Sequence, residues 1–185
     1  SIPLQQVTKE QRYAAKAVNF GIIYGISDYS LSQDINVSVK NAGKYIKDYL
    51  EHYSGVKEYM ERIVKTAIEN GYVKTIYGRR RYLPELSSPK HSVREFGKRV
   101  ALNAPIQGSA ADIMKIAMIK VYDEMKTKKL KSRLILQVHD ELVIEASIDE
   151  IEEVKSILLH NMRDSFELSV PLEIDLSQQN SLLKG

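Results

Sequence analysis

The chain has 185 residues, 43% of them hydrophobic and 28% charged, which is ordinary usage for one globular domain or two small lobes. It contains no cysteine, which excludes a disulfide framework and a thiolate zinc site and suits a reducing interior. No stretch is long and apolar enough to cross a bilayer, so we expect no membrane partner.

The net charge of +3 hides a division along the chain. Residues 1–139 carry 24 Lys or Arg against 13 Asp or Glu, a net +11, whereas residues 140–175 carry 2 against 11, a net −9. A basic body suits a polyanion such as nucleic acid, because each cation that meets a phosphate releases a counterion. The alternative is a solvated surface with uneven charge.

The first half of the chain is predicted to be mainly helical. Thr8 and Gln11 have the spacing of a capping box, and the apolar period after them predicts a helix to Tyr24, ended by Gly25. Further helices are expected over residues 28–35, 39–53 and 56–70. Residues 72–83 are expected to form a short hairpin whose basic tip faces DNA, or is simply a solvated charge run; the tip consists of Arg79, Arg80 and Arg81.

The second half is predicted to mix helices and strands. Two helices, over residues 93–103 and 107–128, are expected to meet at a joint marked by Pro105. Strands are expected at 133–138 and 142–146, joined by a turn. A helix over residues 148–166 and a last strand over 170–176 complete the pattern.

One stripe of the first helix combines cations with aromatic rings. Arg12, Lys16, Phe20 and Tyr24 recur every four residues, so each step turns the side chain by only about 40°. Two cations followed by two rings could hold phosphates at one end and a sugar and base at the other. The alternative is an amphipathic helix with the two rings in the core.

The expected turn between the strands carries His139, Asp140 and Glu141. A tight turn exposes carboxylates with little freedom, and Mg²⁺ takes such oxygen ligands. The alternatives are an ordinary polar turn or a His-Asp metal phosphohydrolase, although the other three histidines show no ligand spacing.

A third set of polar residues, Arg99, Asn103 and Gln107, also steps by four. These side chains can bond to sugar-phosphate oxygens or to the groove edges of a duplex. A helix surface followed by a cap is the alternative.

Together these segments resemble family A DNA polymerase of the bacterial polymerase I type. Arg12-Tyr-Ala-Ala-Lys16-Ala-Val-Asn-Phe20-Gly-Ile-Ile-Tyr24-Gly is similar to its fingers-helix motif, and Gln137-Val-His-Asp-Glu141 to its palm carboxylate motif. Tyr77-Gly-Arg-Arg-Arg-Tyr-Leu-Pro84 and Asn103-Ala-Pro-Ile-Gln-Gly-Ser-Ala-Ala-Asp-Ile113 follow in the family's order between them. The resemblance implies an α/β (α+β) protein in which a helical fingers lobe, residues 1–90, packs on part of an antiparallel palm sheet, residues 91–185.

The resemblance also implies roles for individual residues. Arg12 and Lys16 would bind the incoming triphosphate, with Lys16 also catalytic, Phe20 would pack against its sugar and base, and Tyr24 would guard the templating base. Asp140 would be a ligand of catalytic Mg²⁺, Glu141 a supporting catalytic carboxylate and His139 a nucleotide-binding neighbour. The primer-template duplex would be contacted near the nascent base pair by Arg99, Asn103 and Gln107.

One half of the expected two-ion site is missing from the sequence. The second aspartate should come from a motif resembling Asp-Tyr-Ser-Gln-Ile-Glu, and no such string occurs. With its Ser-Ile-Pro start, the chain is therefore expected to be a fragment, inactive alone, whose partners are primer-template DNA, dNTP and the remaining polypeptide with the thumb and first palm motif. A non-catalytic DNA-binding module and one chain of a split polymerase are the alternatives. The expected location is the cytoplasm, at the nucleoid, or an organelle.

Overall fold

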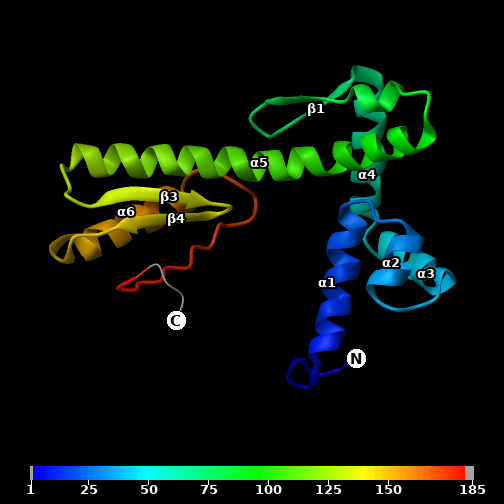
Figure 1. The fold of residues 1–185 in the computed structure, drawn as a ribbon, viewed down its shortest axis with the longest axis horizontal. Coiled ribbons are helices and arrows are strands. Elements are labelled where there is room, and N and C mark those ends of the chain that lie inside the picture. Colours follow the sequence, from blue (N-terminus) through cyan, green and yellow to red (C-terminus); the bar gives the residue numbers. More distant parts are fainter. Residues whose placement is uncertain (1, 182–185) are drawn as a thin grey trace. The chain divides into compact units, whose positions relative to one another are not determined.

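The computed structural model describes residues 2–181, so Ser1 and residues 182–185, at the ends of the two expected subdomains, lie outside the described residues. The chain divides into two compact units, Ser1–Gly108 and Ser109–Gly185. Helices predominate, and each unit contains one two-stranded antiparallel sheet (Figure 1). The predicted α+β class is thereby confirmed.

The first unit consists of short helices and one hairpin. Its elements are η1 (Leu4–Gln6), α1 (Lys9–Ile23), α2 (Asp28–Asp34), α3 (Val39–His52), α4 (Ser54–Asn70), β1 (Tyr72–Lys74), β2 (Arg80–Tyr82), η2 (Pro84–Ser87) and the first part of α5 (His91–Thr127). All four helices expected before residue 71 and the hairpin after it are confirmed, with ends shifted by up to two residues.

Local sequence explains where these helices begin and end. The side chains of Thr8, Ser27 and Ser38 each accept a hydrogen bond from a backbone N–H three residues on, at the start of α1, α2 and α3. At the end of α4, Gly71 adopts a left-handed conformation with φ 73°, which glycine reaches without strain.

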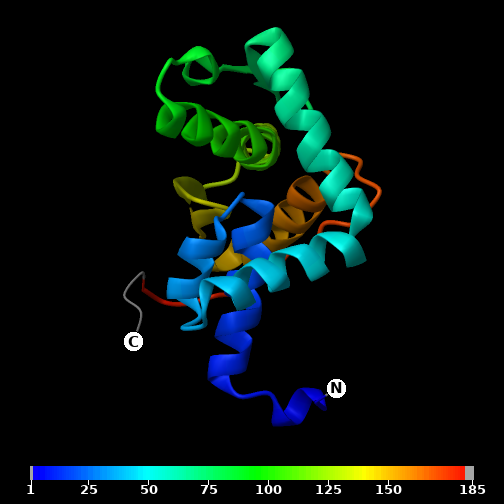
Figure 2. The same ribbon diagram turned by 90° about the vertical axis from the view of Figure 1, so that its right-hand side faces the viewer.

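The core of this unit lies where α4, the hairpin and α5 meet. Ala67, Val73, Leu83 and Ala101 are at most 3% exposed, and Ile63, Leu86, Val100 and Ala104 pack around them. By contrast, Ile22 is the buried residue of α1, and the N-terminal part of that helix extends beyond α2 and α3 (Figure 2).

Helix α5 corrects the prediction of a joint at Pro105. The helix runs without interruption from His91 to Thr127 with Pro105 inside it. Proline removes one backbone hydrogen bond, at about 3 kcal/mol, but burial of Ala101 and Leu102, 0% and 6% exposed, stabilises this stretch. None of the described helices, α5 included, is long and apolar enough to cross a membrane.

The second unit places a hairpin beside two helices. The end of α5 is followed by β3 (Arg133–Val138), β4 (Glu141–Glu145), η3 (Ile148–Glu150) and α6 (Ile151–Arg163). Residues from α5 and α6 form its core, which Leu142 and Ile144 of β4 cover; the buried members are Val121, Met125, Val154, Ile157 and Leu158. The predicted hairpin and final helix are confirmed.

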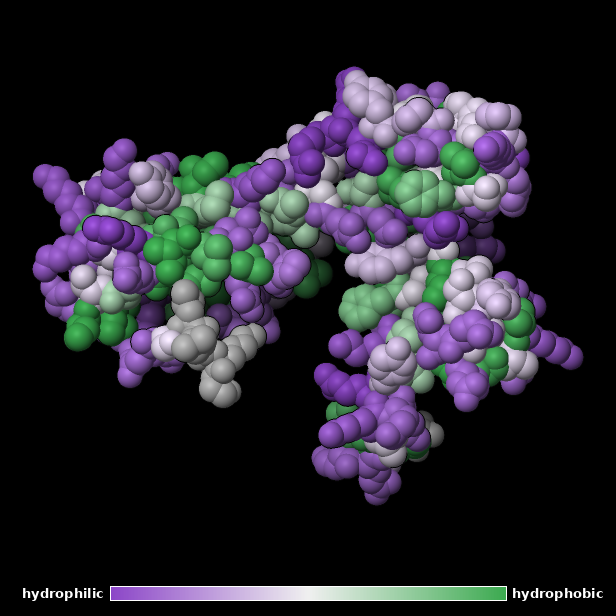
Figure 3. Space-filling view, in the orientation of Figure 1, coloured by the Kyte–Doolittle hydropathy of each residue, from purple (hydrophilic) through white to green (hydrophobic). Residues whose placement is uncertain are grey.

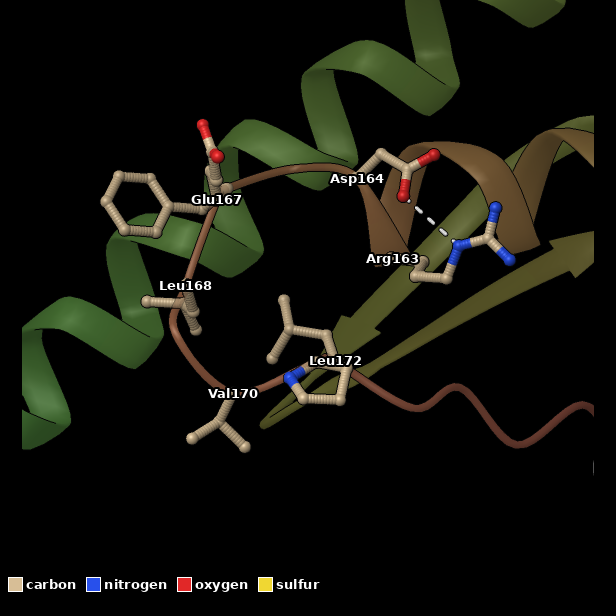
Figure 4. Close-up of a pocket in the computed structure, with 8 residues that line it drawn as sticks. Arg163, Asp164, Glu167, Leu168, Val170 and Leu172 are labelled. Carbon is tan, nitrogen blue, oxygen red and sulfur yellow. Dashed lines mark hydrogen bonds and ion pairs between the residues drawn. The ribbon is translucent and has the colours of Figure 1, made fainter.

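The prediction of a strand over residues 170–176 is wrong. This segment has no regular secondary structure. Alternating apolar residues suggested a strand, but a strand also needs a neighbour to pair with its backbone, and β3 and β4 pair only with each other in the described chain. Leu168, Val170 and Leu172 instead line a small pocket beside the Arg163–Asp164 ion pair (Figure 4).

Candidate nucleotide-binding and catalytic site

The cation and aromatic stripe of α1 is exposed at Arg12, Lys16 and Phe20, and Tyr24 at its end is half-buried. Arg12 and Lys16 face solvent, and their side chains make no hydrogen bond or ion pair with any described residue. Phe20 is 53% exposed, which contradicts the alternative of a core residue. Its ring stacks on that of Tyr24, with centroids 6.4 Å apart. The helix therefore presents two available cations and the Phe20 ring to solvent, and the half-buried Tyr24 ring supports Phe20.

Gly25 brings the aromatic end of this stripe to α5. Its φ is 75°, and a methyl group there would lie 2.9 Å from Leu102 Cδ1 and 3.4 Å from Arg99 Cγ. The bend after Tyr24 thus packs directly on the turn of α5 that carries Arg99. The stripe and the first member of the polar ladder, predicted separately, lie together in one unit.

A groove of about 890 Å³ opens at this junction. Ile26, Met60 and Leu102 contribute apolar surface, and the charged lining is of mixed sign, with Lys98 ion-paired to Glu95 at 2.7 Å. The groove belongs entirely to the first unit. Neither its volume nor its α4 lining was foreseen, because residues 60–68 showed only ordinary helical spacing.

The polar ladder lies on one continuous helix, α5, although a joint at Pro105 was expected between Asn103 and Gln107. Because the helix continues through Pro105, the side chains of Arg99, Asn103 and Gln107 follow one face. Arg99 and Gln107 are exposed, whereas the Asn103 side-chain oxygen is buried and has no hydrogen-bond partner. An unpaired buried acceptor is unfavourable, and the other two members of the ladder are the ones that solvent or a ligand can reach.

The carboxylate turn in the second unit is tight. Val138 pairs with Glu141, so His139 and Asp140 form the two-residue connection, and Glu141 begins β4. His139 has φ 51°, a left-handed conformation that is uncommon outside glycine. The Gln137 side-chain amide donates to the His139 carbonyl at 2.7 Å, a positioning contact that sequence reasoning did not assign to Gln137.

The base of the same hairpin is held by a second set of hydrogen bonds. Glu150 accepts from the backbone N–H groups of Lys131 and Ser132, at 2.9 and 2.8 Å, and from the Ser132 hydroxyl at 2.6 Å. These donors stabilise the carboxylate and lower the pKa of Glu150, the Lys131 N–H having the largest effect. Both ends of the hairpin are thus restrained.

The turn offers oxygen ligands for a metal ion but not a complete set. The carboxylates of Asp140 and Glu141 are exposed and bond to no described side chain, and oxygen donors are what Mg²⁺ prefers. Among residues 2–181, no group of three or more His, Asp or Glu could hold a metal ion. The donor chemistry fits Mg²⁺, and the ligand number requires groups from elsewhere.

The predicted site residues fall into two groups. The α1 stripe and the α5 ladder belong to the first unit, and the turn with His139, Asp140 and Glu141 belongs to the second. In the first unit, the structure brings the bend at Gly25 to Arg99, and in the second unit His139, Asp140 and Glu141 are consecutive residues of one turn.

Cations that can bind phosphates and carboxylates that can bind Mg²⁺ are the kinds of group that enzymes of phosphoryl and nucleotidyl transfer use. The family model described as DNA polymerase family A matches residues 1–183, and the chain belongs to this family. It is 50% identical to DNA polymerase I of Caldicellulosiruptor bescii and 52% identical to that of Bacillus subtilis, matches that cover 96% and 93% of the chain.

A solved structure is similar as well. It is described as the POL domain of Pol1 from M. smegmatis in complex with DNA primer-template and dNTP. The TM-score is 0.88 at 45% identity, over 93% of this chain and 30% of that one. The chain spans only about a fifth of the length of the two relatives, 21% and 20%.

Proposed function

We propose that this chain is the fingers and partial palm of a DNA-directed DNA polymerase, which transfers a nucleotide from dNTP to a primer 3′-hydroxyl. The observation that carries the proposal is the exposed stripe of α1, with two cations that bond to no described side chain and a stacked ring pair. Membership of the family over residues 1–183 supports it.

Each group of residues has a role in this proposal. Arg12 and Lys16 bind the triphosphate, Phe20 packs against the sugar and base, and Tyr24 controls the place of the templating base. The duplex beside the nascent base pair is contacted by Arg99, Asn103 and Gln107. The M. smegmatis structure is a complex with DNA primer-template and dNTP, which supports these two kinds of partner.

Asp140 and Glu141 supply carboxylate oxygens for Mg²⁺, and His139 lies beside the nucleotide. When bound, a pair of ions would stabilise charge on the attacking and leaving oxygens. Because one aspartate cannot hold such a pair, the remaining metal ligands come from the rest of the polymerase polypeptide. The place of action in this proposal is the cytoplasm, at the nucleoid.

The β3–β4 sheet supports the need for further polypeptide. Ile135, Leu136 and Val138 are 46%, 47% and 39% exposed, and hydrophobic residues gather over this hairpin in Figure 3. One face of this sheet packs on α5 and α6, and exposed apolar residues such as these mark a surface that another segment covers. We infer that additional palm segments cover it.

A chimaera tests the proposal. The chain replaces the homologous segment of the Bacillus subtilis relative, and template-directed primer extension is measured with Mg²⁺. We expect the chimaera to extend primers, and Lys16→Ala and Asp140→Asn each to lower kcat/KM by at least about a hundredfold. Lys44→Ala, which removes an exposed cation from α3, serves as the matched control.

The isolated chain completes the test. We expect it not to extend primers alone. An inactive chimaera that still binds DNA would indicate the non-catalytic module instead. Activity restored by adding the missing segments as a separate polypeptide would indicate that the two parts can function as a split polymerase.

A further inference from the structure

Gly108 lies in close contact with the basic hairpin of the first unit. A methyl group at this position in α5 would lie 2.7 Å from Thr75 Cγ2 and 3.4 Å from Arg79 Nη2. Its φ is not positive, so backbone conformation does not demand glycine. Glycine inside a helix is about 1 kcal/mol less favourable than alanine. The close approach of the hairpin is therefore the reason that the structure offers for glycine here.

Hydrogen bonds reinforce this contact. The Arg79 guanidinium donates from Nη2 to the Gly108 carbonyl at 3.1 Å. Within the loop, the Arg79 N–H donates to Thr75 Oγ1 at 3.2 Å, and the Thr75 N–H donates to the Arg79 carbonyl at 2.9 Å. The two residues that touch Gly108 thus also hold the loop between β1 and β2.

The hairpin held in this way carries positive charge and no carboxylate. The cations of Lys74 and Arg80 lie 5.6 and 4.7 Å from the centre of the Tyr72 ring, and Arg80 and Arg81 are exposed. No Asp or Glu occurs between residues 70 and 84. Stacking on the ring preorganises the Arg80 guanidinium while leaving it open to a ligand.

Gly108 follows Gln107, the last member of the α5 ladder, so the hairpin meets α5 beside the ladder. We propose that Gly108 is a positioning residue: the space left by its missing side chain seats the β1–β2 hairpin on α5. This contact joins the hairpin cations and the Asn103–Gln107 face into one surface for the phosphodiester backbone of duplex DNA. The inference rests on the proposed DNA-binding function. It adds that the β1–β2 hairpin, seated at Gly108, forms part of the DNA-binding surface.

Three variants of the 185-residue chain test the contact. Gly108→Ala introduces the clash, and adding Thr75→Ser relieves it, because serine lacks the methyl group but keeps the hydroxyl that accepts from Arg79. Gly55→Ala is the matched control, since a methyl group there meets no atom within 4 Å. Binding of a fluorescent primer-template duplex is followed by anisotropy across a salt series, and hydrogen exchange is followed at the hairpin amides.

We expect Gly108→Ala to displace hairpin cations from DNA phosphates. For each phosphate that is no longer neutralised, the variant should bind DNA about fivefold more weakly at about 0.15 M salt. The salt slope, which is the slope of log K against log salt concentration, should become less steep by about 0.9 per phosphate. The hairpin amides should exchange faster. The double variant should recover both properties, and Gly55→Ala should behave as the unchanged chain. If Gly108→Ala does not fold, recovery of folding and binding in the double variant supports the contact.

Two results would overturn the inference while leaving the proposed function intact: wild-type affinity and salt slope for Gly108→Ala, or a folded double variant with protected hairpin amides that still binds weakly. Failure of the unchanged chain to bind the duplex would count against the proposed function and, with it, this inference.

Discussion

The side-chain amide of Gln137 donates a 2.7 Å hydrogen bond to the backbone carbonyl of His139, across the turn that presents Asp140. His139 itself adopts a left-handed conformation with φ 51°. A side chain on β3 thus holds a strained residue in place, and the carboxylate beside that residue gains a defined position. The geometry of the tip therefore depends on residues that carry no negative charge.

Replacing Gln137 should loosen this turn. We expect Gln137→Ala to lower the free energy of unfolding by about 0.5–1.5 kcal/mol, the usual contribution of one hydrogen bond. Gln137→Glu should cost more, because a carboxylate cannot donate to the carbonyl and stands near Asp140. Urea denaturation measures both, with Gln178→Ala, in a segment without secondary structure, as control. Equal stability of all three variants would contradict the role of the bond.

Substitutions at His139 should rank by their tolerance of positive φ. Glycine and asparagine should match or exceed histidine in stability, whereas valine should be about 1–2 kcal/mol less stable because its branched side chain clashes in this conformation. Thermal unfolding checks the order. The same series at Glu145, in the strand β4, should rank valine above glycine. The same order at both positions would refute the argument from φ.

Gly25 and Gly71 separate conformational strain from packing. Both have positive φ, 75° and 73°, but a methyl group meets Leu102 at 2.9 Å only at Gly25 and meets nothing within 4 Å at Gly71. We expect Gly71→Ala to lower the free energy of unfolding by about 1–2 kcal/mol and Gly25→Ala to lower it further, since Leu102 must also move. Chemical denaturation tests this, and a smaller loss for Gly25→Ala would disprove the close packing of Tyr24–Gly25 on α5.

Glu150 should make stability depend on pH in the acidic range. Hydrogen bonds from Lys131 and Ser132 lower the pKa of Glu150 in the folded chain. Its contribution is therefore present above the unfolded-state pKa, near 4.5, and is lost as the pH falls through the lower folded-state pKa. Urea midpoints measured from pH 7 to pH 3 should fall less steeply for Glu150→Gln than for the unchanged chain.

Glu58→Gln is the charge-matched control for that experiment, because Glu58 is exposed on α4 and makes no ion pair in the described part of the chain. Its midpoints should follow those of the unchanged chain. A Glu150→Gln variant with the same pH profile as the unchanged chain would mean that the hydrogen bonds to Glu150 contribute no stability.

The predictable parts of this fold were those with local causes. The caps at Thr8, Ser27 and Ser38 and the left-handed Gly71 start or end a helix through hydrogen bonds within four residues. The helices that begin or end at these residues were confirmed. The errors arose where distant packing decides. Pro105 does not end α5, since Ala101 and Leu102 of the preceding turn are buried, and residues 170–176 form no strand, since no described edge pairs with them.

The same distinction applies to the candidate site. The sequence alone was enough to recognise the four motifs, including the cation and aromatic stripe of α1 and the carboxylate turn. Helical period and turn chemistry depend only on residues close together in the chain. Only the tertiary structure decided that Phe20 is exposed, that Gly25 packs on α5 at Arg99, and that Gly108 makes room for Thr75. These are contacts or exposures at residues up to 77 positions apart in sequence, and no local period encodes them.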